Sequence, residues 1–240
     1  MTPPAGPAAE DLDAAVVRAD AADLDILSLV IAGAFYDLAP SRWLIDDPAA
    51  RRDIFPGYFR IYVEHAMASG VIHTTPDRTA AALWIPVGED GPSQPPDYDA
   101  RLPVATSPWT SRFLAFDAAL DRHHPAGVAH HHLAILAVSP QRQGQGIGTA
   151  LLRAYHQMLD KARVPAYLEA SDLRTRQIYL RNGYTDRPPI QLPDDGPQMY
   201  PMWRECRPEA VPAGGQGEPA GQIPPLPRRI PKETHDDASR

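Results

Sequence analysis

The feature that most constrains this chain is an apolar strand, a glycine-rich loop and an amphipathic helix in direct succession. The strand is predicted over His130–Val138 and the helix over Gly146–Ala162. A strand followed at once by a helix with one buried face is typical of a partly parallel sheet covered by helices. The apolar residues of this helix recur every three or four positions and form one stripe: Ile147, Ala150, Leu151, Ala154, Tyr155, Met158, Leu159 and Ala162.

The loop between them carries Gly144, Gly146 and Gly148. Glycines let the backbone approach a ligand closely, and the free N–H groups at a helix start carry positive dipole charge. This combination is suited to an anion such as a pyrophosphate. The alternative is a tight strand-to-helix turn that uses glycine only for its backbone dihedrals.

Two common phosphate motifs are excluded by spacing. A P-loop requires glycine directly before lysine, and no such pair occurs in the chain. A dinucleotide fingerprint requires a third glycine where Thr149 stands, and Val164 lies where its ribose-binding acid is expected.

The remaining elements complete a single α/β domain with a mixed α+β sheet that is partly parallel and flanked by helices. We expect an edge strand at 15–19, a helix from residue 21 to 38 and a helix from 48 to 69 that Pro56 kinks or splits. Residues 87–108, rich in Pro, Gly and Asp, are expected to be a long loop. Further expected elements are strands at 71–75, 79–86, 166–170 and 199–204, and helices at 109–122 and 173–182.

Composition narrows the function classes. The net charge is −7 and no basic patch is visible, which disfavours nucleic acid as a partner. No apolar run is long enough for a membrane helix, no basic residue precedes an apolar stretch at the N-terminus, and Cys206 is the only cysteine. These features predict a cytoplasmic protein without structural disulfides or a metal site. Ten of the 28 prolines fall in the 44 residues of two expected disordered tails, 1–10 and 207–240, around a domain at 11–206. Within the second tail, 223–231 has polyproline II character.

One motif match is more specific. The run Gln141-Arg-Gln-Gly144-Gln-Gly146 fits Q/R-x-x-G-x-G/A, and Ile178-Tyr-Leu-Arg-Asn-Gly-Tyr184 fits Y-x-x-x-G-[FY] at the expected distance. On these motifs the chain resembles the GNAT acetyltransferase superfamily. The run Val164-Pro-Ala-Tyr-Leu-Glu-Ala-Ser171 is most similar to the branch that contains puromycin N-acetyltransferase.

The resemblance implies an enzyme that binds acetyl-CoA and transfers its acetyl group directly to a primary amine. The acceptor is expected to be a small antibiotic-like molecule or a metabolite, and the protein a monomer or homodimer. The alternatives are a protein or peptide N-acetyltransferase and a catalytically silent acyl-CoA-binding regulator. The residues implied for the cofactor are Leu136, Ala137, Val138, Gln141, Arg142, Gln143, Gly144, Gln145, Gly146, Ile147, Gly148, Thr149, Thr175 and Tyr179.

Two catalytic residues are implied. Tyr179 matches the family's general acid, which protonates the departing sulfur; the alternative is a core aromatic. Glu169, a lone acid on an apolar strand, is the candidate base, and burial is expected to raise its pKa. Its alternative is an acid that faces solvent or pairs with an arginine. Asp172, Asp46, Asp47 and a bridging water are rival proton acceptors. Tyr36 is the preferred acceptor-site residue, together with Glu169.

Some features depart from this pattern or have simpler explanations. Thr175 stands where the family often has asparagine near the pantetheine arm. His130, His131 and His132 resemble a metal cluster, but neighbours on a strand point to opposite faces, so a polar strand entrance is favoured. Cys206 has no obvious activating partner, which disfavours a nucleophile.

Overall fold

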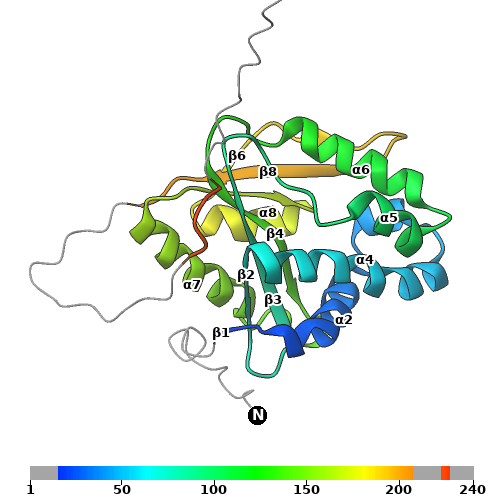
Figure 1. Ribbon diagram of the computed structural model, residues 1–240, viewed down its shortest axis with the longest axis horizontal. Helices are drawn as coiled ribbons and strands as arrows, with labels where there is room; N and C mark the ends of the chain where they lie inside the picture. The colour runs from blue at the N-terminus through cyan, green and yellow to red at the C-terminus, as the bar shows by residue number, and fades with distance from the viewer. Residues whose placement is uncertain (1–15, 208–222, 228–240) are drawn as a thin grey trace, which may run out of the picture.

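The computed structural model describes residues 16–207 and 223–227, and all structural statements below concern those residues (Figure 1). The predicted tail at 1–10 lies outside them, as does most of the predicted tail at 207–240. Among the described helices, none combines the length and apolar character that a membrane crossing needs.

A mixed sheet forms the centre of the molecule, with the strand order β1-β2-β3-β4-β5-β8-β6 and β7 paired to β8 (Figure 1). Only β4 and β5 are parallel neighbours, and every other described pair is antiparallel. The mixed, partly parallel sheet predicted from sequence is therefore confirmed. The strands are β1 (Val17–Arg18), β2 (Val71–Thr74), β3 (Ala80–Val87), β4 (His130–Val138), β5 (Ala166–Ala170), β6 (Thr185–Asp186), β7 (Ile190–Gln191) and β8 (Gln198–Arg204).

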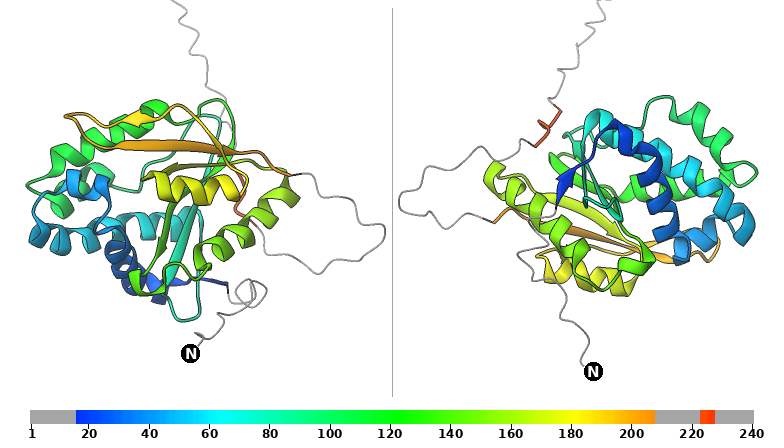
Figure 2. Two further views of the ribbon diagram at one scale, coloured as in Figure 1. Left: turned by 180° about the vertical axis from the view of Figure 1, so that it is seen from behind. Right: turned by 90° about the horizontal axis from the view of Figure 1, so that it is seen from below.

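Helices cover both faces of the sheet, as the views in Figure 2 show. One face packs against α2 and α4, and the opposite face packs against α7. The helical elements are the 3₁₀ turns η1 (Ala21–Asp23) and η2 (Pro140–Arg142), and the helices α2 (Leu24–Phe35), α3 (Ala39–Leu44), α4 (Pro48–Ser69), α5 (Tyr98–Thr106), α6 (Thr110–His123), α7 (Ile147–Ala162) and α8 (Leu173–Arg181).

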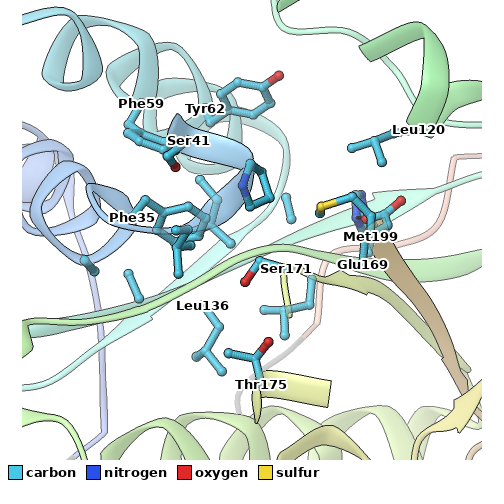
Figure 3. Close-up of a pocket in the computed structure, with 18 of the residues that line it drawn as sticks. Phe35, Ser41, Phe59, Tyr62, Leu120, Leu136, Glu169, Ser171, Thr175 and Met199 are labelled. Atoms are coloured by element: carbon cyan, nitrogen blue, oxygen red, sulfur yellow. Dashed lines mark hydrogen bonds and ion pairs between the residues drawn. The ribbon is translucent and has the colours of Figure 1, made fainter. Parts of the chain in front are cut away.

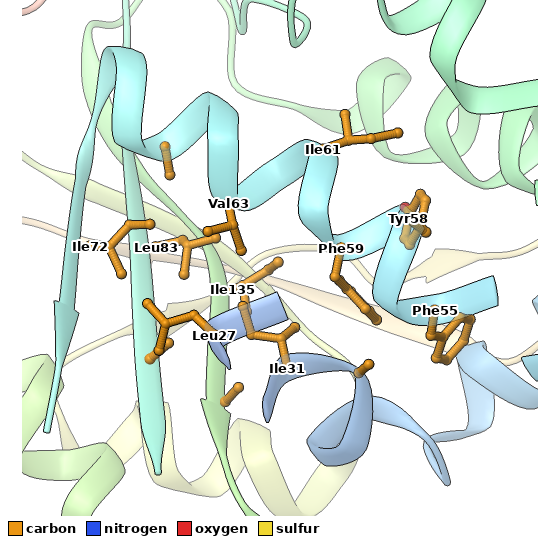
Figure 4. Packing of buried hydrophobic residues seen from close by; sticks show 14 of the residues in the cluster. Leu27, Ile31, Phe55, Tyr58, Phe59, Ile61, Val63, Ile72, Leu83 and Ile135 are labelled. Carbon is orange, nitrogen blue, oxygen red and sulfur yellow. The ribbon is translucent and has the colours of Figure 1, made fainter. Parts of the chain in front are cut away.

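The larger core lies between the first face of the sheet and the helices α2 and α4 (Figure 4). Leu27 and Ile31 of α2 and Phe59 of α4 pack on Leu83 and Ile135 of the sheet, and all five are at most 6% exposed. This burial fixes the helices that wall the cavity described below. Side chains of this size each contribute roughly 1.5–3 kcal/mol when fully buried.

The pairing of β4 with β5 is short, and this opens the sheet. Their ladder comprises only His131 with Ala166 and His132 with Tyr167. On the other side of β4, the register with β3 shifts so that Leu83 opposes Ile135 and Trp84 opposes Leu133. Ala134 is therefore the extra residue of a bulge, a device that often lies beside active sites. Beyond these positions the ends of both strands border an open cavity.

The structure corrects two expectations about local structure. The predicted loop at 87–108 contains α5, which forms because Tyr98 and Leu102 are buried against neighbouring helices. Pro56 was expected to kink or split the helix, and it does not split it, since α4 continues through it. Phe55 and Phe59 on either side of the proline are both buried, so tertiary packing holds the turn that lacks one backbone hydrogen bond.

Buried neutral histidines make stability depend on pH. Burial lowers the pKa of His130 and His131 to about 4 and that of His156 to about 3, from an ordinary 6.5. Between pH 6.5 and 4 the unfolded chain therefore binds protons that the folded chain does not, so stability falls as the pH drops. We expect a loss on the order of 3 kcal/mol per histidine.

Urea unfolding at pH 7.5 and pH 4.5 measures this loss. His156 Nε2 lies 3.0 Å from the Tyr184 hydroxyl, so His156→Gln keeps a polar partner there and should weaken the pH dependence. An unfolding midpoint that is equal at both pH values contradicts the expectation.

Candidate active site

A cavity of about 790 Å³ lies between the diverging strands β4 and β5 and the helices α4, α5, α6 and α8 (Figure 3). Its lower part, in the view of Figure 3, is bordered by Leu136, Ser171 and Thr175. Its upper part is bordered by aromatic side chains of α2 and α4, including Phe35 and Phe59. Glu169 stands at one side beside Met199. The same cavity therefore connects the glycine loop with Glu169 of β5.

The glycine loop has the backbone conformation that its sequence predicts. Gly144 has φ +79° and Gly146 has φ +83°, both in the left-handed region that favours glycine. A Cβ at Gly144 would meet no atom within 4 Å, so open space lies in front of the loop. No side chain caps α7 at Gly146, which leaves its first amides available to a ligand. The loop therefore presents an anion site at the N-terminus of a 16-residue helix.

Most of the predicted cofactor residues border this cavity. They are Leu136, Ala137, Val138, Arg142, Gln143, Gly144, Gly146, Ile147, Gly148, Thr149, Thr175 and Tyr179.

Gln141 and Gln145 are not among the residues that border it. Arg142 reaches the cavity, but its guanidinium is paired with Asp77 and also donates to Gln145 at 3.0 Å. Its positive charge near the loop is thus already partly neutralised.

Tyr179 reaches the cavity from α8. The helix begins with a reciprocal cap in which Asp172 accepts from the Thr175 amide at 2.7 Å, and this fixes the orientation of its first turn. Tyr179 is 8% exposed, and its hydroxyl forms no hydrogen bond with the described part of the chain. Burial, reinforced by the charge of Asp172, raises the pKa of Tyr179 well above its ordinary value. The hydroxyl therefore stays protonated at neutral pH and is free to donate.

Glu169 is paired with a histidine that sequence reasoning did not select. His132 Nε2 lies 2.8 Å from Glu169 Oε2, and the two side chains are 18% and 6% exposed. A carboxylate only accepts, so Nε2 of the imidazole carries the hydrogen. His124 of the loop after α6 approaches the other oxygen, with Nδ1 at 3.9 Å from Oε1. All three side chains border the cavity.

The expectation that burial raises the pKa of Glu169 was wrong in direction. Burial alone acts that way, but the positive potential and hydrogen bond of His132 outweigh it, so the pKa lies below its ordinary value. Glu169 is therefore ionised at neutral pH. Its Oε1 is buried and has no hydrogen-bond partner among the described residues. This unsatisfied oxygen needs a donor, and the adjoining cavity is open to one.

The other proposed acids are engaged in structural contacts. Asp172 caps α8, and Asp47 caps α4 by accepting from the Ala49 amide at 2.8 Å. Asp46 accepts from Trp109 Nε1 at 3.2 Å.

Tyr36, the preferred acceptor-site residue, is not among those that border the cavity. Its hydroxyl donates to the Pro48 carbonyl at 2.8 Å, and Arg51 lies over its ring. The tyrosines that do border the cavity include Tyr58, Tyr62 and Tyr98.

The three consecutive histidines separate onto two faces, as the strand period predicts. His131 lies 2.9 Å from the Tyr155 hydroxyl on the α7 face, whereas His132 faces the cavity. His130 lies 3.1 Å from His124. The strand entrance is buried rather than solvated, because His130 and His131 are fully buried. Within the described ranges, no group of histidine, cysteine and acidic side chains is arranged to hold a metal ion.

Comparison with known proteins shows what this chain is similar to. Residues 112–186, from α6 to β6, match the sequence model of the acetyltransferase (GNAT) domain. A solved structure from Corynebacterium glutamicum ATCC 13032, titled histone acetyltransferase HPA2 and related acetyltransferase, is 27% identical. The match covers 82% of this chain and 98% of that one, with a TM-score of 0.57.

Two insect structures share the fold at low identity. Arylalkylamine N-acetyltransferase 2 from Aedes aegypti is 10% identical, with a TM-score of 0.54 over 80% of this chain and 98% of that one. Mosquito arylalkylamine N-acetyltransferase like 5b is 14% identical, with a TM-score of 0.50 over 79% and 98%.

Residues 112–186 are therefore similar to the GNAT acetyltransferase domain. The family match and the Corynebacterium structure make the protein an acetyltransferase, an enzyme of the acyltransferase class.

Proposed function

We propose that this protein uses acetyl-CoA to acetylate a primary amine of a small molecule by direct transfer. The observation that carries the proposal is one cavity with an anion-binding glycine loop at one part and the Glu169–His132 pair at another. A phosphate-rich donor and a cationic acceptor would meet in that cavity from different sides.

The chain's residues fit acetyl-CoA. The left-handed glycines and bare amides at the start of α7 would hold the pyrophosphate, and Leu136, Ala137 and Val138 of β4 would lie along the pantetheine arm. Thr175 of α8 would border the same part of the cofactor, with its hydroxyl held by Asp172 in the helix cap at 3.1 Å. When bound, acetyl-CoA supplies an acetyl group activated as a thioester. Backbone amides of β4 left unpaired beside the short ladder would stabilise the developing oxyanion.

Glu169 and His132 act together on the amine. The Glu169 carboxylate attracts the acceptor's ammonium group and holds Nε2–H of His132, which leaves the other ring nitrogen as a proton acceptor. The pair therefore removes the proton that prevents a primary amine from being a nucleophile. This arrangement follows the logic of a histidine oriented by a carboxylate, in which the carboxylate stays ionised.

Tyr179 acts at the other end of the reaction. Its protonated hydroxyl would donate to the sulfur as the carbon–sulfur bond breaks, which gives a neutral thiol in place of a thiolate. One proton thus moves from the amine to the Glu169–His132 pair and another from Tyr179 to sulfur. The tyrosine regains a proton from the amine nitrogen, which loses its second hydrogen as the amide forms.

A small acceptor is favoured by the cavity. The volume of about 790 Å³ lies within the range of small-molecule sites, and Phe35, Phe59 and Tyr62 border its acceptor part. Resemblance to the puromycin-related branch motivates antibiotic-like amines as candidates. Acetylation of a protein lysine is the second candidate function, because the name of the Corynebacterium structure includes a histone acetyltransferase.

Release of the CoA thiol in the presence of a panel of amines and lysine peptides tests the proposal. We expect release to depend on a small primary amine. Release only with peptides would favour the second candidate. Binding of acetyl-CoA without release across the panel would contradict both and indicate a silent acyl-CoA-binding regulator.

A further inference from the structure

A chain of tyrosine hydroxyls leads from α4 to a carboxylate on α6. Tyr58 donates to Tyr62 at 3.4 Å, Tyr62 lies 3.1 Å from the hydroxyl of Tyr98, and Tyr98 donates to Asp117 at 2.8 Å. The three tyrosines and Asp117 all border the cavity. We call these four residues the α4–α6 wall.

The direction of these hydrogen bonds determines which ligand the wall can take. An ionised carboxylate only accepts hydrogen bonds, so the Tyr98 hydroxyl donates to Asp117. The Tyr62 hydroxyl therefore donates to Tyr98, and the Tyr58 hydroxyl donates to Tyr62. The wall is left with lone pairs and no free donor. His65 adds a side chain that is 4% exposed, borders the cavity and has no partner for Nε2 among the described residues. A ligand that satisfies this wall must donate hydrogen bonds.

Within residues 16–207 and 223–227, arginines border the cavity only at its glycine-loop and α8 side, where Asp172 also borders it. The arginines that border it are Arg142, Arg174 and Arg181, beside the glycine loop and on α8. The α6 side instead carries Asp117 and Asp121, and neither forms an ion pair with the described residues.

Asp117 is ionised at neutral pH. Burial raises its pKa to about 6, and the hydrogen bond from Tyr98 limits that rise. A half-buried carboxylate with no cationic neighbour is destabilising, and a bound cation would offset that cost.

The geometry of α6 sets the distance between this wall and the reacting amine. Asp117 and Asp121 are four residues apart and share one side of α6, and His124 is the residue directly after the end of that helix. His124 lies beside Glu169, the group assigned above to the reacting ammonium. Seven residues correspond to about 10 Å along a helix axis. Asp117 therefore lies about two helical turns from His124, the residue beside Glu169.

We propose that the acceptor carries a second protonated amine, and that the α4–α6 wall binds it while the first amine reacts at Glu169. The aromatic rings of Tyr58, Tyr62 and Tyr98 surround the second cation and Asp117 balances its charge. This inference rests on the proposed function and names the acceptor class, a flexible diamine or polyamine.

Matched pairs of acceptors test it. The kcat/KM values for thiol release are measured with 1,8-diaminooctane against octylamine, and with 1,5-diaminopentane against pentylamine. We expect the longer diamine to exceed its monoamine about tenfold or more, which is the effect of one charge-assisted contact. In Asp117→Asn this ratio should fall toward one. Asp53→Asn removes an exposed acid from α4 and should keep the ratio.

The outcomes separate this inference from the proposed function. Equal kcat/KM for diamines and monoamines in the unchanged protein overturns the inference and leaves the acetyltransferase intact. A fall of both activities by the same factor in Asp117→Asn indicates a structural role and also overturns it. If no amine is acetylated, calorimetry of 1,8-diaminooctane with the CoA complex tests directly whether the α4–α6 wall binds a diamine. Binding that Asp117→Asn abolishes and Asp53→Asn keeps supports the wall, and absence of binding contradicts it.

Discussion

Replacement of Tyr179 by phenylalanine is expected to lower kcat by about 10²-fold or more, because the departing sulfur loses its proton donor. The Tyr179 ring is buried in the core between the sheet and α7, where Ile178 and Tyr184 also pack. Phenylalanine therefore preserves the packing. The dissociation constant for CoA should change little, since only a hydroxyl is removed. Steady-state kinetics together with direct CoA binding measure the two effects separately.

Tyr184→Phe is the matched control for this variant. Tyr184 lies 5.7 Å from Tyr179 between ring centroids, but it does not border the cavity, and its hydroxyl bonds His156. Its loss should reduce stability by about 1 kcal/mol and leave kcat nearly unchanged. If Tyr179→Phe turned over at a normal rate, the tyrosine would be excluded as the acid.

The second large effect is expected at the Glu169–His132 pair. Glu169→Gln and His132→Gln should each lower kcat/KM by about 10²-fold or more, since general-base catalysis contributes that much. Because the two side chains act as one unit, the double variant should be scarcely slower than either single one. Initial rates for the four proteins, measured from pH 6 to 9, give this comparison.

His123→Gln serves as the control for the histidine change. His123 lies at the end of α6, where its Nδ1 is 2.8 Å from the Ala119 carbonyl, and it does not border the cavity. It should retain normal activity. Multiplicative losses in the double variant would show that Glu169 and His132 act independently, and an unchanged pH profile in Glu169→Gln would remove the carboxylate from proton transfer.

The residues around the glycine loop were predicted better from the sequence than those around Glu169 and the α4–α6 wall, for a physical reason. The glycine loop and the stripe of α7 are local features, so their spacing alone specifies a strand, an anion site and a helix. Gly144 and Gly146 adopt the left-handed backbone that this interpretation requires. Tyr179 reaches the cavity through a helix whose start and end are also encoded locally, by Asp172 and Gly183.

The acceptor part depends on contacts between residues far apart in the chain. Glu169 meets His132 because β4 and β5 are parallel neighbours, and sequence reasoning had treated that histidine only as part of a strand entrance. Tyr98 meets Asp117 only because α5 forms within a segment whose prolines and glycines indicated a loop. Tyr36 was expected at the acceptor site because it lies on a helical stretch near the expected cleft, yet its hydroxyl donates to the Pro48 carbonyl.

In the proposed reaction, one cavity binds acetyl-CoA and an amine, and the acetyl group passes between them without a covalent enzyme intermediate. Acetyl-CoA carrying an isotopically labelled acetyl group tests it directly, when it is mixed with the protein and 1,8-diaminooctane and analysed by mass spectrometry. We expect the label to appear in an amide of the amine, in amounts equal to the free CoA, with none on the protein. Labelled protein that forms before the amide, or free CoA with labelled acetate in place of amide, would contradict it.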